Sequence, residues 1–123
     1  MGYPHAAATA YATLDPCLMS AGRAEAQVFA RVTRRLEVVF AKDEVPAAER
    51  AAALHDNRRL WQAAAVACAS DDNALAPALR ASLVSLAGFV DRHTSEVLGG
   101  AAEPSVLVEI NRRVAAGLSA GGF

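Results

Sequence analysis

The sequence of 123 residues has few of the residues on which catalysis, redox chemistry and metal binding usually depend. It contains two cysteines, Cys17 and Cys68, three histidines, and one tryptophan, two tyrosines and four phenylalanines. Two cysteines are too few for a disulfide framework, and the lack of a C-x-x-C pair excludes the common zinc and thioredoxin-type motifs. The sequence therefore predicts a reduced, cytoplasmic protein in which Cys68 is a small core residue.

An excess of charge of either sign is also lacking. Twelve basic residues against 13 acidic residues give a formal net charge of -1. No whole-chain basic field exists to attract nucleic acid or anionic lipid, and the aromatic residues are scattered singly and form no stacking platform for bases. We therefore expect no direct nucleic-acid binding, and we interpret paired arginines such as Arg34-Arg35 as helix surface.

Long hydrophobic runs are absent too. The longest uncharged segments in the body of the chain, residues 60–70 and 81–90, are much shorter than the about 18 residues that a membrane-spanning helix needs. The first 14 residues have neither the basic start nor the leucine-rich stretch of a secretory signal peptide. These features predict a protein with no membrane segment and a cytoplasmic location.

Catalytic and cofactor motifs are equally scarce. No Walker or Rossmann glycine loop and no H-E-x-x-H pair occurs. On one helix His55 would lie about 20 Å from Cys68, too far for a nucleophile and its base. His93, Glu96 and Glu103 are conceivable metal ligands. Metal sites normally need three or four ligands at a matching spacing, and these three residues do not match such a spacing. We expect no catalytic residues, no cofactor and no metal, and hence a protein that is not an enzyme.

Alanine is what the sequence has in abundance, with 30 residues, and it is the best helix former. Leucine, valine, phenylalanine and isoleucine together number 29, enough for a thin but ordered core. A chain of this length is normally one domain. The composition therefore predicts a single helical domain over residues 1–123.

Proline, glycine and capping residues divide the chain into five predicted helices. Because the residue before a proline avoids the α-helical region, a short first helix is predicted to end before Asp15-Pro16. Ser20 is the predicted N-cap of the second helix, and Gly99-Gly100 supplies the left-handed residue that often follows a helix. The predicted helices cover residues 4–13, 20–42, 46–69, 77–98 and 104–118, with a frayed tail at 119–123.

In the four longer helices apolar residues recur at spacings of three and four, which places them on one face. Short connections favour antiparallel neighbours. We therefore predict an all-α fold, an elongated antiparallel bundle of about five helices, one of them short and N-terminal. The predicted core-facing residues are Phe29, Val32, Leu36 and Val39; Leu54, Asn57, Trp61, Ala64 and Cys68; Leu79, Leu83, Leu86, Val90, His93 and Val97; and Leu107, Asn111, Val114 and Leu118.

Three polar residues, Asn57, His93 and Asn111, interrupt these apolar faces, one on each of the last three predicted helices. Buried polar side chains need partners, and an asparagine in an apolar seam can fix the register of helices. We predict that the three residues form a buried polar layer. The alternative is that His93 contacts a ligand.

Trp61 follows two arginines, a composition found both in core anchors and in interface hot spots. Filling of the bundle core is slightly favoured over an interface role. The alanine-rich faces of such a bundle also offer shallow grooves to an amphipathic helix. Binding of another helical protein is therefore the function most compatible with these residues.

Four collinear segments give the sequence a family resemblance: HDNRRLW at residues 55–61, NAL at 73–75 with LR at 79–80 and LVSL at 83–86, FVDRHT at 89–94, and LVEINR at 107–112. Taken together, they resemble the flagellar biosynthesis regulator FlaF family of alphaproteobacteria. The resemblance spans about residues 5–118. It implies the following characteristic residues: Asn57, Arg58, Trp61, Arg92, His93, Thr94, Glu109, Asn111 and Arg112.

The resemblance also implies a function and partners. FlaF-like proteins are understood as cytoplasmic, non-enzymatic proteins that bind flagellin as a secretion chaperone and promote flagellin synthesis, export and filament assembly. The alternative is a regulatory adaptor that acts through the translational regulator FlbT or through flagellin mRNA, with only indirect contact to flagellin. In that case Arg58, Arg92 and Arg112 are expected to face solvent as one patch.

One segment departs from the family pattern. Residues 20–25 lack the Pro-Arg that family members tend to carry before the glutamate, and the chain has Gly22-Arg23-Ala24-Glu25 in its place. The start of the second helix, and any contact made there, is therefore the part of the resemblance that carries over least well.

Overall fold

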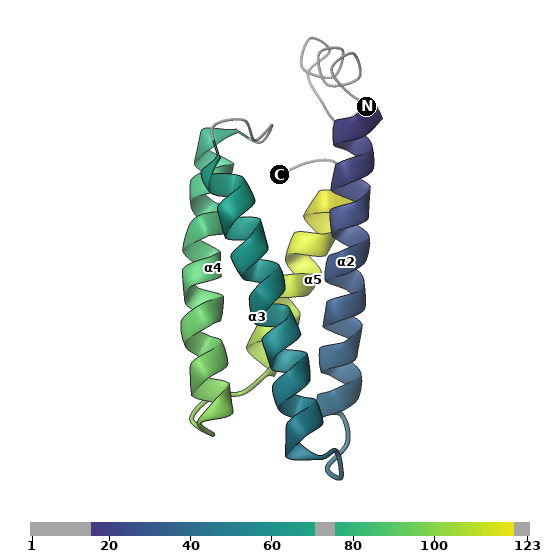
Figure 1. Cartoon of the computed structure of the whole chain (residues 1–123), viewed down its shortest axis with the longest axis vertical. Helices are drawn as coiled ribbons and strands as arrows, with labels where there is room; N and C mark the ends of the chain where they lie inside the picture. The colour runs from purple at the N-terminus through teal and green to yellow at the C-terminus, as the bar shows by residue number, and fades with distance from the viewer. Residues whose placement is uncertain (1–15, 71–75, 120–123) are drawn as a thin grey trace.

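A computed structural model describes the backbone of residues 16–70 and 76–119 and the side chains of residues 26–70 and 76–117. These residues form four helices and no strand: α2 at Pro16–Phe40, α3 at Ala47–Ala69, α4 at Pro77–Leu98 and α5 at Ser105–Ser119 (Figure 1). The all-α prediction is confirmed. The short helix predicted at residues 4–13 lies outside the described residues.

The helices start where proline fits their first turn. Proline has no backbone N–H to donate, so it suits the beginning of a helix. Pro16 begins α2, Pro46 directly precedes α3, and Pro77 begins α4. The prediction that Ser20 caps the second helix is therefore wrong: Ser20 lies within α2, because the helix starts one turn earlier, at Pro16.

The end of α4 follows the predicted glycine signal. Gly100 has a φ of 78°, and the N–H groups of Gly100 and Ala101 donate to the carbonyl oxygens of Val97 and Glu96 at 3.0 and 2.8 Å. This pair of bonds is the Schellman arrangement, which satisfies the last free carbonyls of a helix. It turns the chain sharply toward α5.

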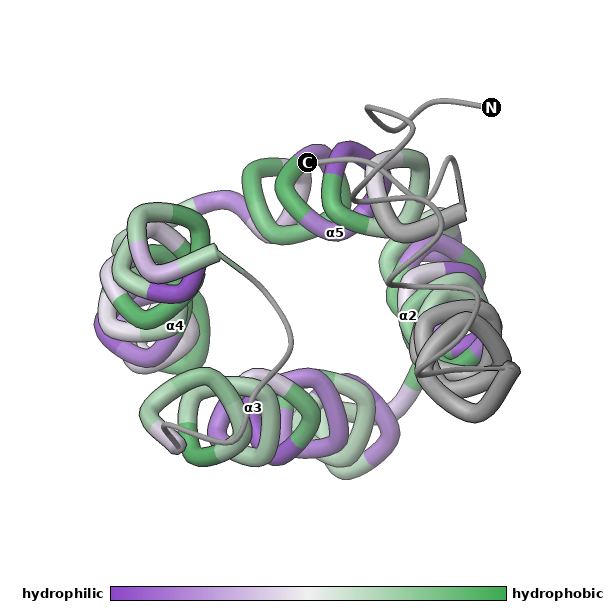
Figure 2. The backbone as a smooth tube through the Cα atoms, turned by 90° about the horizontal axis from the view of Figure 1, so that it is seen from above, coloured by the Kyte–Doolittle hydropathy of each residue, from purple (hydrophilic) through white to green (hydrophobic). Residues whose placement is uncertain are grey.

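Viewed from above, the four helices surround the centre in chain order, α2, α3, α4 and α5 (Figure 2). Successive helices run in opposite directions, as predicted from their short connections (Figure 1). Among neighbouring helices, the most extensive contacts join α2 to α5 and α3 to α4, and the fewest join α4 to α5. The bundle is therefore built from two closely packed helix pairs.

The core between these pairs centres on Trp61, which is 1% exposed. Its ring meets Phe29 edge to face, with 5.4 Å between ring centroids. Leu36, Leu54 and Leu107 are equally buried around it. The core interpretation of Trp61 is thus confirmed.

The buried face of α4 differs from the predicted one. Leu83 and Val90 are buried as expected, but the rest of the face consists of Ala87 and Thr94, and His93 is not part of it. The small side chain of Ala87 permits a close approach of the neighbouring helix. Compared with the prediction, α4 is therefore rotated about its axis. The larger apolar residues Leu79, Leu86 and Val97 lie at the edge of its buried face and are only half-buried.

Candidate partner-binding site

A polar cluster lies at the centre of the bundle and joins two helices that do not pack directly against each other. Asn57 and Trp61 project from α3, and Asn111 projects from α5. Trp61 Nε1 donates to Asn111 Oδ1 at 2.8 Å, and Asn111 Nδ2 donates to Asn57 Oδ1 at 2.6 Å. Since both asparagines are 0% exposed, these bonds fix the position of α3 relative to α5.

One donor in this cluster has no hydrogen-bond partner among the described residues. Asn57 Nδ2 is fully buried and finds no acceptor among the described residues. A buried polar group without a hydrogen bond costs about 1 to 3 kcal/mol. The polar cluster therefore specifies the register of α3 and α5 more than it adds to the stability of the bundle.

His93 is not a member of the central cluster, so the predicted three-residue layer is wrong in this respect. Its Nε2 lies 2.8 Å from the Glu103 carbonyl oxygen in the connection between α4 and α5, and its side chain is 12% exposed. Phe89 stacks on the imidazole with ring centroids 5.3 Å apart. Because α4 is rotated, Thr94 takes the buried position and donates to the Val90 carbonyl oxygen at 2.6 Å.

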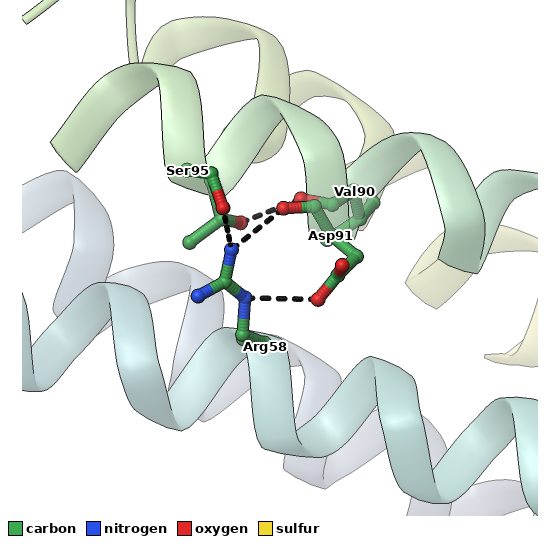
Figure 3. A network of polar contacts seen from close by, with 5 residues as sticks. Arg58, Val90, Asp91 and Ser95 are labelled. Carbon is green, nitrogen blue, oxygen red and sulfur yellow. Dashed lines mark hydrogen bonds and ion pairs between the residues drawn. The ribbon is translucent and has the colours of Figure 1, made fainter. Parts of the chain in front are cut away.

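A second polar group links α3 to α4 around Arg58. The Arg58 Nε lies 3.0 Å from the Asp91 carboxylate, and its Nη2 donates to the Asp91 carbonyl oxygen at 2.7 Å and to the Ser95 hydroxyl (Figure 3). The Arg58 side chain is 20% exposed, and its guanidinium reaches both groups from the facing helix. Arg58 therefore acts as a bracket between α3 and α4.

The remaining residues implied by the resemblance lie on the outer surface. Arg112 donates to the carboxylate of Glu37 and so links α5 to α2. Glu109 pairs with Arg113 one turn later at 2.9 Å. Arg92 is exposed on α4. These side chains are accessible to a partner, in contrast to Asn57, Trp61, Thr94 and Asn111.

The arginine patch expected of a regulatory adaptor is not formed. Arg58 is engaged with Asp91 between α3 and α4, while Arg112 is engaged with Glu37 between α5 and α2. The two guanidinium groups thus bridge different helix pairs, and they do not form one common patch on the surface.

Sequence reasoning missed the partners of these arginines. Asp91 and Ser95 contact Arg58, and Glu37 contacts Arg112, yet none of the three was singled out as a site residue. Asp91 and Ser95 are four residues apart on one helix, a spacing that could have marked them as neighbours. No sequence spacing could have indicated Glu37, because α2 and α5 are far apart in the sequence and pair only in the folded protein.

Large apolar side chains are exposed on every described helix: Val38, Val66, Val84, Phe89, Leu98 and Val106. Single exposed apolar residues are normal on a protein surface. A groove lies between the end of α2 and the start of α5, with a volume of about 450 Å³. This groove is one candidate binding surface among the described residues.

The described residues contain no group of three histidine, cysteine, aspartate or glutamate side chains that could hold a metal ion. No helix in the described part of the chain is long and apolar enough to cross a membrane. Cys68 is buried near the end of α3, as its sequence context predicted.

Two closely packed helix pairs, each bridged by an arginine and joined to each other by the asparagine cluster, define a small α-helical bundle protein. The family model described as flagellar protein FlaF matches residues 7–118, and the chain belongs to this family. It is accordingly a flagellar protein. Comparison with curated proteins and with solved structures returns no significant match.

Proposed function

We propose that the protein binds flagellin in the cytoplasm as a secretion chaperone and thereby promotes flagellin synthesis, export and filament assembly. The observation that carries this proposal is membership of the FlaF family over nearly the whole chain. A flagellar protein built only of helices in its described part, with apolar side chains on its surface, suits the binding of another helical protein. The proposed role requires no catalysis, cofactor or metal.

The physical task of such a chaperone is to cover apolar surface on a free subunit. A helix that is meant to pack in a filament exposes its apolar stripe beforehand, and exposed stripes promote aggregation. A small bundle that covers one stripe keeps the subunit monomeric and competent for export. The fraction of chaperone molecules that are bound to flagellin then reflects the supply of flagellin.

The test is direct binding between the purified full chain and its cognate flagellin. Calorimetry at tens of micromolar is expected to show saturable association, and co-expression followed by size-exclusion chromatography is expected to give co-elution at one to one. Absence of association in both measurements contradicts the proposal. A complex with an FlbT-like regulator but none with flagellin would assign the protein to the adaptor class.

Salt dependence separates a protein partner from a nucleic acid. Phosphate contacts weaken steeply between about 50 and 200 mM salt. Association with flagellin is expected to persist over that range, because burial of apolar surface drives it. Binding to flagellin mRNA that collapses over the same range would support the adaptor instead.

A further inference from the structure

The groove at one end of the bundle combines an apolar floor with acidic walls. It lies where the last turn of α2 meets the first turns of α5, and its volume is about 450 Å³. Phe40 and Val108 are half-buried and contribute the accessible apolar side chains, whereas Leu36 is fully buried, and every lining residue belongs to the described part of the chain. Its floor can therefore accept apolar side chains of a partner.

Three carboxylates surround this floor: Glu37, Glu103 and Glu109. Arg112 pairs with Glu37, and Arg113 pairs with Glu109. Glu103 is exposed and its carboxylate has no cationic partner among the described residues. The groove therefore has an excess of negative charge, with one carboxylate free to bind a cation.

The acidic character extends over the whole end of the molecule. The connection between α2 and α3 and that between α4 and α5 lie at the same end of the bundle (Figure 1). Residues 37–50 and 96–113, which include both connections, contain seven acidic and four basic side chains. The rest of the sequence has eight basic and six acidic residues, so the excess of acidic residues is concentrated in these two segments.

We propose that this groove binds a helical segment of the flagellar partner, a segment that carries lysine or arginine beside its apolar stripe. The inference rests on the proposed function and names the surface and the chemistry of recognition. Apolar side chains of the segment pack on Phe40 and Val108, and its basic residue pairs with Glu103. Complementary charge selects the orientation, and apolar burial supplies most of the affinity.

Two substitutions test the groove in the full chain. Glu103→Lys reverses the free charge, and Ser105→Trp fills the groove from an exposed position in the first turn of α5. Glu44→Lys is the matched control, because Glu44 is exposed at the same end but does not line this groove. All three variants are first checked for unchanged helicity and unfolding midpoint.

The expected result with flagellin is a selective loss of affinity. Glu103→Lys is expected to weaken binding about three- to tenfold, since an exposed attraction is replaced by repulsion. Ser105→Trp is expected to weaken it about tenfold or more, and Glu44→Lys less than about twofold. If flagellin binds the wild-type chain and both groove variants equally well, the groove inference is overturned while the proposed function stands.

A probe pair keeps the inference testable if flagellin itself does not bind. The full chain labelled with ¹⁵N is titrated with a synthetic amphipathic helix that carries lysines beside a leucine stripe, and with its counterpart in which glutamates replace the lysines. Shifts of the amide signals of residues 36–41 and 103–112 with the lysine peptide alone support the groove. Shifts elsewhere, or equal shifts with both peptides, overturn it.

Other occupants give distinct results in the same experiments. A second copy of the chain would appear as a dimer in size-exclusion chromatography that Glu103→Lys dissociates, and this result would replace the proposed occupant. A failure of flagellin to bind together with a positive lysine-peptide titration would reject the proposed function and retain the groove chemistry.

Discussion

At the scale of single residues, two asparagine side chains occupy the centre of the bundle, where burial of a polar group is costly unless it is hydrogen-bonded. Asn57 and Asn111 are both 0% exposed and depend on each other and on Trp61 for hydrogen bonds. Replacing a buried hydrogen-bonded pair by apolar groups of similar shape is often neutral or stabilising, whereas removing one partner is costly. This asymmetry makes the cluster testable.

Asn111→Leu is expected to destabilise the protein by about 2 to 4 kcal/mol, because it leaves Trp61 Nε1 and the Asn57 amide without partners. Urea unfolding followed by tryptophan fluorescence measures the loss. The double variant with Asn57→Leu and Asn111→Leu is expected to be more stable than Asn111→Leu alone by at least about 1 kcal/mol. A double variant no more stable than the single variant would show that the cluster does not act as one unit.

Arg58→Lys tests the bracket between α3 and α4. Lysine cannot reproduce the three contacts of the guanidinium with Asp91 and Ser95, so a loss of about 1 to 2 kcal/mol is expected in the free energy of unfolding. Arg59→Lys, at the exposed neighbouring position, is the control and is expected to stay within about 0.5 kcal/mol of wild type. Equal effects of the two substitutions would contradict the bracket.

At the scale of the helices, the boundaries follow local signals that the chain itself carries. Pro16 and Pro77 begin α2 and α4, and Gly100 ends α4 with the left-handed backbone that other residues avoid. The largest difference between a predicted and an observed boundary, at Ser20, has a physical reason: Pro16 fits the first turn of a helix and therefore begins α2.

Two glycines near and within α4 should respond in opposite directions to alanine. Gly100→Ala is expected to destabilise by about 1 kcal/mol, because φ is 78° there. Gly88→Ala is expected to stabilise by about 0.5 to 1 kcal/mol, since Gly88 is helical and the added Cβ meets only the Arg92 side chain at 3.5 Å. Thermal unfolding by circular dichroism measures both. A stabilising Gly100→Ala would refute the proposed end of α4.

At the scale of the whole molecule, the described helices form two pairs that are joined by the packing of α2 on α3 and by hydrogen bonds between α3 and α5. Trp61 contacts Phe29 of α2 and Asn111 of α5, and Arg35 of α2 pairs with Asp56 of α3. The coupling between the two pairs therefore depends on the α2–α3 interface and on the hydrogen bonds of Trp61 and Asn111. The acidic groove lies within one of these pairs, at the end of the bundle where the last turn of α2 meets the first turns of α5.

Trp61→Leu is expected to cost about 3 kcal/mol and to lower the cooperativity of unfolding, because it removes both the edge-to-face contact and the bond to Asn111. Hydrogen exchange is expected to show α2 with α5 and α3 with α4 as separately opening units. Val66→Ala, at a position that is 75% exposed, is the control and should change neither property. Uniform exchange in the Trp61 variant would show that the pairs are joined in other ways.

The sequence by itself determined the all-α class, most helix boundaries, the buried face of α3 and the family resemblance. These depend on proline and glycine signals, on three- and four-residue periodicity and on collinear motifs, all of which are local. Only the tertiary structure decided which helices pair, that α4 is rotated toward Thr94, that His93 caps the α4–α5 connection, and that Glu37, Glu103 and Glu109 meet at one groove. A local pattern states that a face is apolar but not which neighbour covers it, because that choice depends on how the faces of distant helices fit together.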